Sequence, residues 1–287
     1  MPGSRPRRSP ETMRARLRGL ALGLSTILGL RRRGFFIPYR YAAAVVPADY
    51  PALEPIFAEA RPRGADVLAA IESFAGDLRR IAGGEGPARF DQDWFPRLDA
   101  AAAYAIVRRE RPTRIVEIGS GHSTRFLARA VVDERLPTRI TCIDPAPRAD
   151  LRRLTVEHVP VLLKDADPAL FANLGRGDVL FIDSSHIAMP GTDADRLILD
   201  VLPRLRSGTL IHVHDITLPY AYPAEWGWRG YNEQIAVGAL LLGGGFAIEF
   251  ASQDATRSLA PLLQQGILGE LPLRPTAHET SLWLRKR

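Results

Sequence analysis

Four carboxylates stand at the ends of apolar runs, where they could bind a ligand together. They are Glu117, Asp144, Asp183 and Asp215. In open parallel sheets, ligands bind beyond the carboxyl ends of the strands, where the strand order reverses. One acid at a strand end more often caps a loop or a helix, but four of them beside a glycine turn favour a pocket for a small molecule.

The glycine turn lies in the stretch "RIVEIGSGHSTRFLARAV", residues 114–131. Gly119 and Gly121 separate an apolar run from a helix-like pattern, which predicts a strand, a tight loop and a helix. A dinucleotide site would need a third glycine where this chain has Thr124. Glu117 would also sit poorly beside a pyrophosphate, and it suits a ligand with a cationic amino-acid end. Both features disfavour an NAD-type oxidoreductase, which stays as one alternative function. A second alternative is a non-catalytic module that keeps the ligand pocket or associates with a membrane.

Histidines accompany the last two carboxylates, in "IDSSH" and "HVHD". The unperturbed pKa of histidine suits a general base near neutrality, and oxygen and nitrogen ligands could instead hold a divalent ion. We expect His214, Asp215 and His186 to be catalytic, with Asp183 beside them. His212 is expected to face the opposite side of its strand from His214 and is interpreted as structural.

Strands that alternate with helices must position these residues, which predicts a doubly wound α/β fold with a mostly parallel sheet. The expected parallel strands are residues 115–118 and the runs that end at Asp144, near Lys164, at Asp183 and at Asp215. The runs "GGFAIEFAS" and "TSLWLRKR" should pair as a C-terminal antiparallel hairpin at the sheet edge. A helix is expected from about Thr124 to Arg135, with Ser123 or Thr124 as its N-cap.

Composition divides the chain into three expected parts: a basic N-terminal arm (1–40), a helical extension (41–86) and the sheet-bearing domain (87–287). A length of 287 residues suits one large domain with an extension. Cys142 is the single cysteine, which excludes an internal disulfide framework. The arm holds ten arginines and one acid, whereas the remainder has 28 basic and 31 acidic residues, so we expect no nucleic-acid partner.

The arm contains twelve uncharged residues, "GLALGLSTILGL", between Arg18 and Arg31. A bilayer-spanning helix needs about 20 apolar residues, so we expect no span. Arginines 31–33 stand where a signal peptide would have its cleavage site, so we expect no secretion. Two alternatives stay open: a short helix docked on the domain, or an amphipathic helix that lies peripherally in the inner face of a membrane.

The motifs "VEIGSGHST", "CIDP", "LLKDA", "FIDSSH" and "IHVHDI", in this order and spacing, resemble those of the class I S-adenosylmethionine-dependent methyltransferases. The set is most similar to a bacterial group that methylates small molecules. The resemblance covers roughly residues 90–287. It implies a Rossmann-like fold, S-adenosylmethionine as the cofactor and a small-molecule acceptor, whose expected methylated atom is a hydroxyl oxygen. The single cysteine fits a reducing compartment, so we expect the enzyme to be cytoplasmic.

The resemblance also implies roles for single residues. The turn around Gly119 would shape the pocket for the methionine portion, Asp144 would accept hydrogen bonds from the ribose hydroxyls, and Asp165 and Ala166 would meet the adenine edge. The full expected cofactor-binding set is Glu117, Gly119, Ser120, Gly121, His122, Ser123, Asp144, Asp165, Ala166 and Asp183.

A divalent metal is a further possibility. Some methyltransferases of similar fold hold a metal between acids that correspond to Asp183 and Asp215. They usually have Asp-Asn or Asp-Asp where this chain has His214-Asp215, so both outcomes stay open.

The stretch "ITLPYAYPAEWGWRGYNEQ" follows the fifth expected parallel strand and is rich in aromatic residues, which could form a lid over the acceptor or a loop packed on itself. These residues are Tyr220, Tyr222, Trp226, Trp228 and Tyr231. Glu233 and Gln234 begin the next helix and are expected only to cap it.

Overall fold

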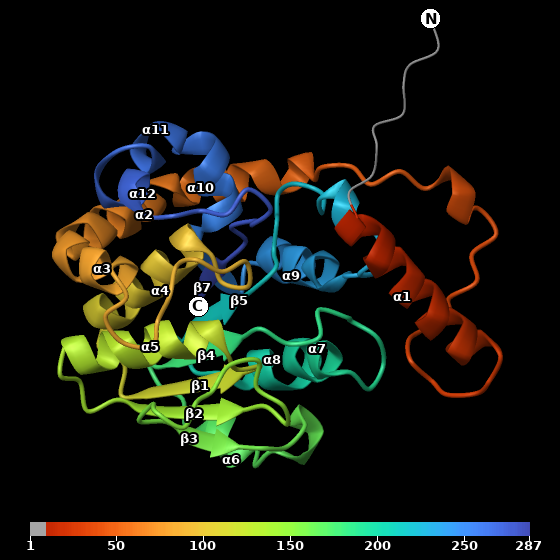
Figure 1. Ribbon diagram of the computed structural model, residues 1–287, viewed down its shortest axis with the longest axis horizontal. Coiled ribbons are helices and arrows are strands. Elements are labelled where there is room, and N and C mark those ends of the chain that lie inside the picture. Colours follow the sequence, from red (N-terminus) through yellow and green to blue (C-terminus); the bar gives the residue numbers. More distant parts are fainter. Residues whose placement is uncertain (1–9) are drawn as a thin grey trace, which may run out of the picture. The chain divides into compact units, whose positions relative to one another are not determined.

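One mixed sheet organises the computed structural model, which describes residues 10–287 without the side chains of residues 10–12, 15 and 16. Within this part of the chain the sheet has seven strands in the order β3-β2-β1-β4-β5-β7-β6. The strands are β1 (Arg114–Ile118), β2 (Arg139–Ile143), β3 (Glu157–Val159), β4 (Val179–Ile182), β5 (Leu210–Val213), β6 (Phe246–Ala251) and β7 (Leu282–Lys286) (Figure 1).

Strands β1 to β5 are parallel, and β7 runs antiparallel to both β5 and β6. The expected doubly wound, mostly parallel sheet is confirmed, as is the antiparallel pairing of the two C-terminal strands. Strand β7 lies between β5 and β6, so the last strand of the chain is not at the edge. The chain leaves β1 toward β2 and β3 and then crosses back to β4, which places the reversal of strand order at β1 and β4.

Helices cover both faces of the sheet. The α-helices of the sheet-bearing part are α2 (Glu54–Ser73), α3 (Ala75–Ala82), α4 (Arg97–Glu110), α5 (His122–Asp133), α6 (Ala169–Ala172), α7 (Asp193–Arg196), α8 (Leu202–Arg204), α9 (Glu233–Leu242), α10 (Ser252–Ser258), α11 (Ala260–Leu263) and α12 (Gly266–Glu270). The remaining helical turns are the 3₁₀ segments η1 (Ala42–Ala44), η2 (Pro51–Leu53), η3 (Leu163–Asp165) and η5 (Ala224–Trp226) and the π-helical segment η4 (Leu197–Val201).

Apolar side chains of β1, β2, β4, β5 and β7 are buried on both faces of the sheet. One core joins Cys142, Phe181 and Trp283 to helices α4 and α5, and the other joins Ile118 and Ile182 to α9 and the segment around η4. Burying one such large apolar side chain stabilises the fold by roughly 1.5–3 kcal/mol. The two cores hold the carboxyl ends of the strands in a fixed arrangement.

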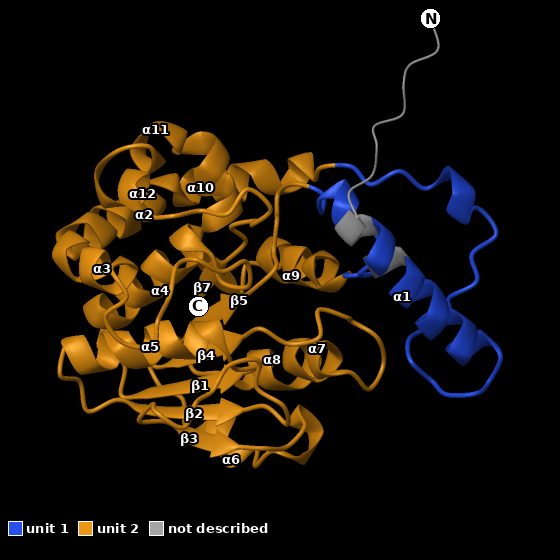
Figure 2. Cartoon of the chain, in the orientation of Figure 1, with its two compact units in different colours: residues 1–48, 221–231 blue, residues 49–220, 232–287 orange. Residues whose placement is uncertain are grey.

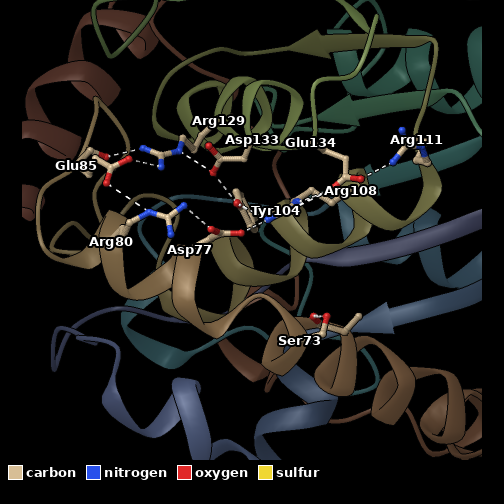
Figure 3. A network of polar contacts seen from close by, with 11 residues as sticks. Ser73, Asp77, Arg80, Glu85, Tyr104, Arg108, Arg111, Arg129, Asp133 and Glu134 are labelled. Atoms are coloured by element: carbon tan, nitrogen blue, oxygen red, sulfur yellow. Dashed lines mark hydrogen bonds and ion pairs between the residues drawn. The ribbon is translucent and has the colours of Figure 1, made fainter.

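A network of charged and hydroxyl groups joins the helices on one side of the sheet (Figure 3). Arg108 of α4 pairs with Asp77 of α3, and its Nε donates to Glu134 Oε2 at 3.0 Å. The hydroxyl of Tyr104 donates to Asp133 Oδ2 at 2.6 Å. Because these partners come from α3, α4 and the end of α5, the network fixes the extension helix against the helices that cover the sheet.

Two local expectations about these elements are wrong. Strand β3 ends at Val159 rather than near Lys164, because Pro160 has no N–H to continue the ladder. Helix α5 begins at His122, preceded by Gly121, rather than with Ser123 or Thr124 as its N-cap.

Contacts divide the chain into two units (Figure 2). The first contains the chain up to Ala48 together with Ala221–Tyr231, and the second contains Asp49–Tyr220 and Asn232–Arg287. Helices α2 and α3, which form within the expected helical extension, belong to the same unit as the sheet. The expected boundary near Gly86 therefore lies inside the second unit.

The first unit contains helix α1 (Pro10–Ile27). Gly29, with φ of 69°, ends this helix, and the N–H of Leu30 donates to the carbonyl of Ser25 at 3.0 Å. Within the described part of the chain, no helix combines the length and the apolar character that crossing a bilayer requires. Three arginines of the expected arm, at positions 5, 7 and 8, lie outside the described residues.

Candidate functional site

The glycine turn brings the ends of β1 and β4 into direct contact. Gly119 has φ of 76°, and a Cβ at this position would lie 1.8 Å from the carbonyl oxygen of Asp183. The N–H of Gly119 donates to the carbonyl of Ile143 at 3.1 Å, which also ties the turn to β2. Only glycine satisfies both the left-handed backbone and this close approach. At Gly121, by comparison, a Cβ would meet the nearest side-chain atom at 3.4 Å.

Glu117 lies beneath the turn and is fully buried. Its carboxylate accepts hydrogen bonds from the hydroxyls of Ser123 at 2.7 Å and Thr124 at 2.5 Å. Those hydroxyls therefore hold the first turn of α5 on β1, and the Thr124 hydroxyl oxygen also accepts the N–H of the N-cap residue, Gly121, at 2.9 Å. Burial raises the pKa of Glu117 to about 7, against the opposing effect of Thr124, Ser123 and Cys142.

A cavity of about 300 Å³ lies at the carboxyl ends of β1, β2 and β4. Its volume is at the lower end of the range for small-molecule sites. Its lining contains Ile118, Gly119, Ser120, Ile143, Asp144, Pro145, Ala146, Arg148, Val161, Leu162, Leu163, Asp183, Ser184, Ser185 and Asp193.

Four residues of the expected cofactor set line this cavity: Gly119, Ser120, Asp144 and Asp183. The other six are not part of its lining: Glu117, Gly121, His122, Ser123, Asp165 and Ala166. The turn thus places Gly119 and Ser120 at the cavity, whereas Gly121 precedes helix α5 and His122 begins it.

The polar groups of the cavity suit a ligand with hydroxyl and charged groups. Asp144 accepts the N–H of Ser120 through Oδ2 and that of Ala146 through Oδ1, both at 2.7 Å. Each carboxylate oxygen keeps a further acceptor position. The hydroxyl oxygens of Ser120 and Ser184 are buried without a hydrogen-bond partner. Buried polar atoms are normally paired, so these two hydroxyls fit a bound polar molecule.

Sequence reasoning missed several residues of this cavity. The guanidinium of Arg148 stacks 4.2 Å from the ring of Trp94 at the cavity wall. The N–H of Ser185 donates to Asp193 Oδ2 at 3.0 Å, which fixes the loop after β4. The position of Arg148 just after "CIDP" was a usable signal, whereas Asp193 depends on how the loop after β4 folds back.

His186 joins three carboxylates at the carboxyl ends of β4 and β5. Its Nδ1 lies 3.1 Å from Glu233 Oε2, and its Nε2 lies 3.3 Å from Asp183 Oδ1 and 3.6 Å from Asp215 Oδ2. Burial by itself would lower the pKa of His186, but the three acids raise it well above its ordinary value. Asp183 has a pKa lowered to about 2, because His214 and His186 outweigh the effect of burial.

The backbone at two of these residues is unusual. His186 has φ of 58° and Asp215 has φ of 53°. Few residues other than glycine adopt the left-handed region, and such residues gather at functional sites. The side-chain directions of His186 and Asp215 therefore depend on left-handed backbone conformations, which the surrounding packing must maintain.

His214 and Asp215 are held by segments distant in the sequence. His214 Nε2 lies 3.1 Å from the carbonyl oxygen of Trp94, and its Nδ1 is buried without a hydrogen-bond partner. The Thr280 hydroxyl donates to Asp215 Oδ1 at 3.1 Å. Asp99 fixes this segment, because it accepts the N–H of Thr280 at 3.0 Å.

The expectation that His212 faces away from His214 is wrong. Their ring centroids are 5.8 Å apart, because residues two apart in a strand share one face of the sheet. The ring of His212 stacks on Phe181 at 3.7 Å, and its Nε2 lies 2.8 Å from the hydroxyl oxygen of Ser281. Its complete burial supports the structural interpretation.

The residues expected to bind a metal do not fit one. Among the side chains that the structure describes, no group of three or more histidine, cysteine, aspartate and glutamate residues could hold a metal ion. The imidazole of His186 lies beside both Asp183 and Asp215.

The expectation for the start of α9 is corrected by the structure. Glu233 is buried and contacts His186, and Gln234 Oε1 accepts the N–H of Thr217 at 3.1 Å. Both side chains therefore bind loops at the carboxyl edge instead of capping their own helix.

The aromatic loop is divided between the two units. Within the first unit, the ring of Tyr222 lies 6.0 Å from that of Trp226 and 6.3 Å from that of Tyr231. In the second unit, Tyr220 lies 3.7 Å from the guanidinium of Arg257. Tyr222, Trp226 and Tyr231 thus pack on one another, and the lid function stays a prediction.

Residues 116–216 match a family model described as a methyltransferase domain. No curated protein sequence matches the chain.

Solved structures that the chain matches include the methyltransferase PaMTH1 of Podospora anserina bound to SAH, at 16% identity over 88% of this chain and 99% of that one, with a TM-score of 0.41. The plantazolicin methyltransferase BpumL in complex with SAH has 16% identity over 81% of this chain and 99% of its own, with a TM-score of 0.41. The branched-chain polyamine synthase of Thermus thermophilus has 16% identity over 74% of this chain and 63% of its own, with a TM-score of 0.43.

Proposed function

We propose that this class I S-adenosylmethionine-dependent methyltransferase transfers the methyl group to a hydroxyl oxygen of a small molecule. One observation carries the proposal: the segment that matches the methyltransferase model brings Gly119, Ser120, Asp144 and Asp183 to one cavity. In this proposal residues 87–287 are the catalytic domain and residues 41–86 are its helical extension.

In this proposal, different residues of the cavity bind different parts of the cofactor. Asp144 offers acceptor positions for the two ribose hydroxyls, and the unpaired hydroxyls of Ser120 and Ser184 bind the polar methionine portion. Glu117 acts from beneath, by fixing the turn through Ser123.

The remaining expected cofactor residues keep their proposed roles at the margins of the cavity. Gly121 and His122 shape the turn at the start of α5, and Asp165 and Ala166 approach the adenine edge at the end of η3.

The cofactor supplies an electrophilic methyl group, so the protein must align the acceptor and remove its proton. We assign to His214 the role of the general base that takes up the proton of the acceptor hydroxyl. The carbonyl of Trp94 can only accept, so Nε2 carries a hydrogen and Nδ1 is the ring atom available to take up the proton. The ionised Asp183 stabilises the resulting positive charge.

Asp215 and His186 complete this arrangement as neighbours of the base. His214 Nε2 lies 3.7 Å from Asp215 Oδ1, and Thr280 fixes that carboxylate. Both ring nitrogens of His186 face carboxylates, which leaves no ring nitrogen open to an acceptor hydroxyl. His186 therefore positions the acids.

Methyl transfer is tested by incubating the full chain with labelled S-adenosylmethionine and a panel of small hydroxyl, amine and carboxylate compounds, with products identified by mass spectrometry. Methylation of hydroxyl compounds supports the proposal. Methylation of nitrogen alone overturns the acceptor assignment. Binding of cofactor without turnover on any compound favours a non-catalytic module, and binding of NADH alone favours an oxidoreductase.

The arm favours a second partner, an anionic membrane surface that would place the enzyme peripherally at the inner membrane face. The apolar stripe of the arm consists of five residues of helix α1, Met13, Leu17, Leu20, Leu24 and Ile27, and of Leu28, which follows the helix. The exposed fractions of these side chains are between 48% and 66%. Arginines flank the stripe on both sides, so its apolar and cationic groups match an interface of anionic lipids.

A further inference from the structure

We infer that the imidazole of His186 provides the positive charge between Asp183 and Asp215 that a divalent cation would otherwise supply, so that this chain needs no metal. The claim that methyl transfer needs no metal rests on the proposed function. The claim that the His186 imidazole occupies the space between the two acids rests on the geometry of the side chains alone.

The first observation is the set of distances around the ring. One nitrogen, Nε2, lies within 3.6 Å of carboxylate oxygens from both Asp183 and Asp215. These acids stand at the ends of the neighbouring strands β4 and β5. Divalent ions bind carboxylate oxygens at roughly 2.0–2.6 Å, so an ion shared by the two acids would compete with the ring nitrogen for the same space.

The second observation is the chemistry of the ring's partners. Nδ1 lies 3.1 Å from Glu233 Oε2 while Nε2 faces Asp183 at 3.3 Å. Ionised carboxylates only accept hydrogen bonds, and an imidazole with two donors is the protonated, cationic form. A neutral ring could donate at one nitrogen only and would direct a lone pair at the other carboxylate. The charged ring therefore satisfies the acids on both of its sides.

The third observation is that the ring is fixed in place. His186 is 3% exposed and Glu233 is 1% exposed. The carbonyl of His186 accepts the N–H groups of Asn232 at 3.1 Å and Glu233 at 3.3 Å, so the start of α9 holds its backbone as well as its ring. A charge that is buried between acids in this way resembles a bound ion in its effect on the site.

The inference is tested by electron paramagnetic resonance titration of Mn²⁺ into the full chain after chelation. The wild-type protein is expected to show no stoichiometric binding. In His186→Gly, which tolerates the left-handed backbone and leaves the acids without their cation, we expect at least tenfold tighter Mn²⁺ binding, in a 1:1 ratio. His186→Asn keeps a neutral polar group at the position and is expected to bind less tightly than His186→Gly.

Two further measurements locate the effect. His186→Gly combined with Asp215→Asn should lose the gained binding, and added imidazole should compete with Mn²⁺ in His186→Gly. Stoichiometric Mn²⁺ binding by the wild type, or a folded His186→Gly protein that binds no better than wild type, overturns the inference. If His186→Gly fails to fold, the wild-type titration alone decides. The titration needs no methyl acceptor, so failure of the proposed function would leave its result intact.

Discussion

Gly119 approaches Asp183 so closely that a Cβ on the glycine would lie 1.8 Å from the aspartate carbonyl oxygen. The contact joins the ends of β1 and β4, the two strands at which the strand order reverses. It brings the glycine turn and the acid after β4 to one cavity, on which the cofactor site depends.

Gly119→Ala should therefore be far more harmful than Gly121→Ala. The new methyl group at position 119 collides with backbone at a left-handed φ, which should reduce the free energy of unfolding by about 2–5 kcal/mol. At position 121 the nearest side-chain atom is 3.4 Å away, so the loss should stay below about 1 kcal/mol. Urea denaturation of both variants measures these losses. Equal losses in the free energy of unfolding would show that the close contact between Gly119 and Asp183 does not restrict position 119 to glycine.

Glu117 should make stability depend on pH. Its pKa is raised to about 7, so the folded state binds a proton that the unfolded state releases. The stabilisation is full below the unfolded pKa and is lost as the pH rises through 7, by about 3 kcal/mol in total. In Glu117→Gln the free energy of unfolding should fall less between pH 5 and pH 8. Gln at the exposed Glu59 is the control, and the idea fails if Glu117→Gln keeps the wild-type pH dependence.

His214→Ala and Asp215→Asn should abolish turnover while the affinity for S-adenosylhomocysteine stays within about twofold. Neither side chain lines the cofactor cavity, and the proposed role of His214 is confined to the acceptor proton. Thr280→Val removes the hydroxyl that fixes Asp215 and should lower kcat by about tenfold, which corresponds to one lost hydrogen bond. A variant that loses cofactor affinity in parallel with kcat would contradict this division.

The full chain should co-sediment with vesicles that contain phosphatidylglycerol, and added salt should release it. Each basic residue near an anionic surface contributes about 1 kcal/mol. Leu17→Ser with Leu24→Ser should weaken the attachment, whereas a chain that starts near Gly34 should stay folded, bind cofactor and remain unattached. A truncated chain without a melting transition would show that the leucines belong to the core, and self-association in light scattering would indicate a second copy as the partner.

The sequence predicted the sheet and four cavity residues because those signals are local. An apolar run followed by an acid or a glycine marks a strand end, and parallel strands bring their carboxyl ends together. Glu233 and Thr280 were beyond such reasoning, because they lie 47 and 65 residues from the partners they fix. Their roles exist only after α9 and the segment before β7 pack at the carboxyl edge.

One expected cofactor residue, Glu117, lies outside the cavity lining for a local reason. Glu117 was expected at the ligand, but hydroxyls on the first turn of α5 draw its carboxylate beneath the turn. The sequence motif predicted the strand and the turn around Glu117, but it did not predict the direction of the Glu117 side chain.

The most direct test of the cofactor cavity is calorimetric titration of S-adenosylhomocysteine into the wild-type protein and Asp144→Ala. Loss of the carboxylate leaves the ribose hydroxyls and two backbone N–H groups without their acceptor, at about 1–3 kcal/mol. We expect 1:1 binding by the wild type and an affinity about 5- to 150-fold lower in Asp144→Ala, with the melting transition retained. Equal affinity in the two folded proteins, or no binding by the wild type, would contradict the cofactor site described here.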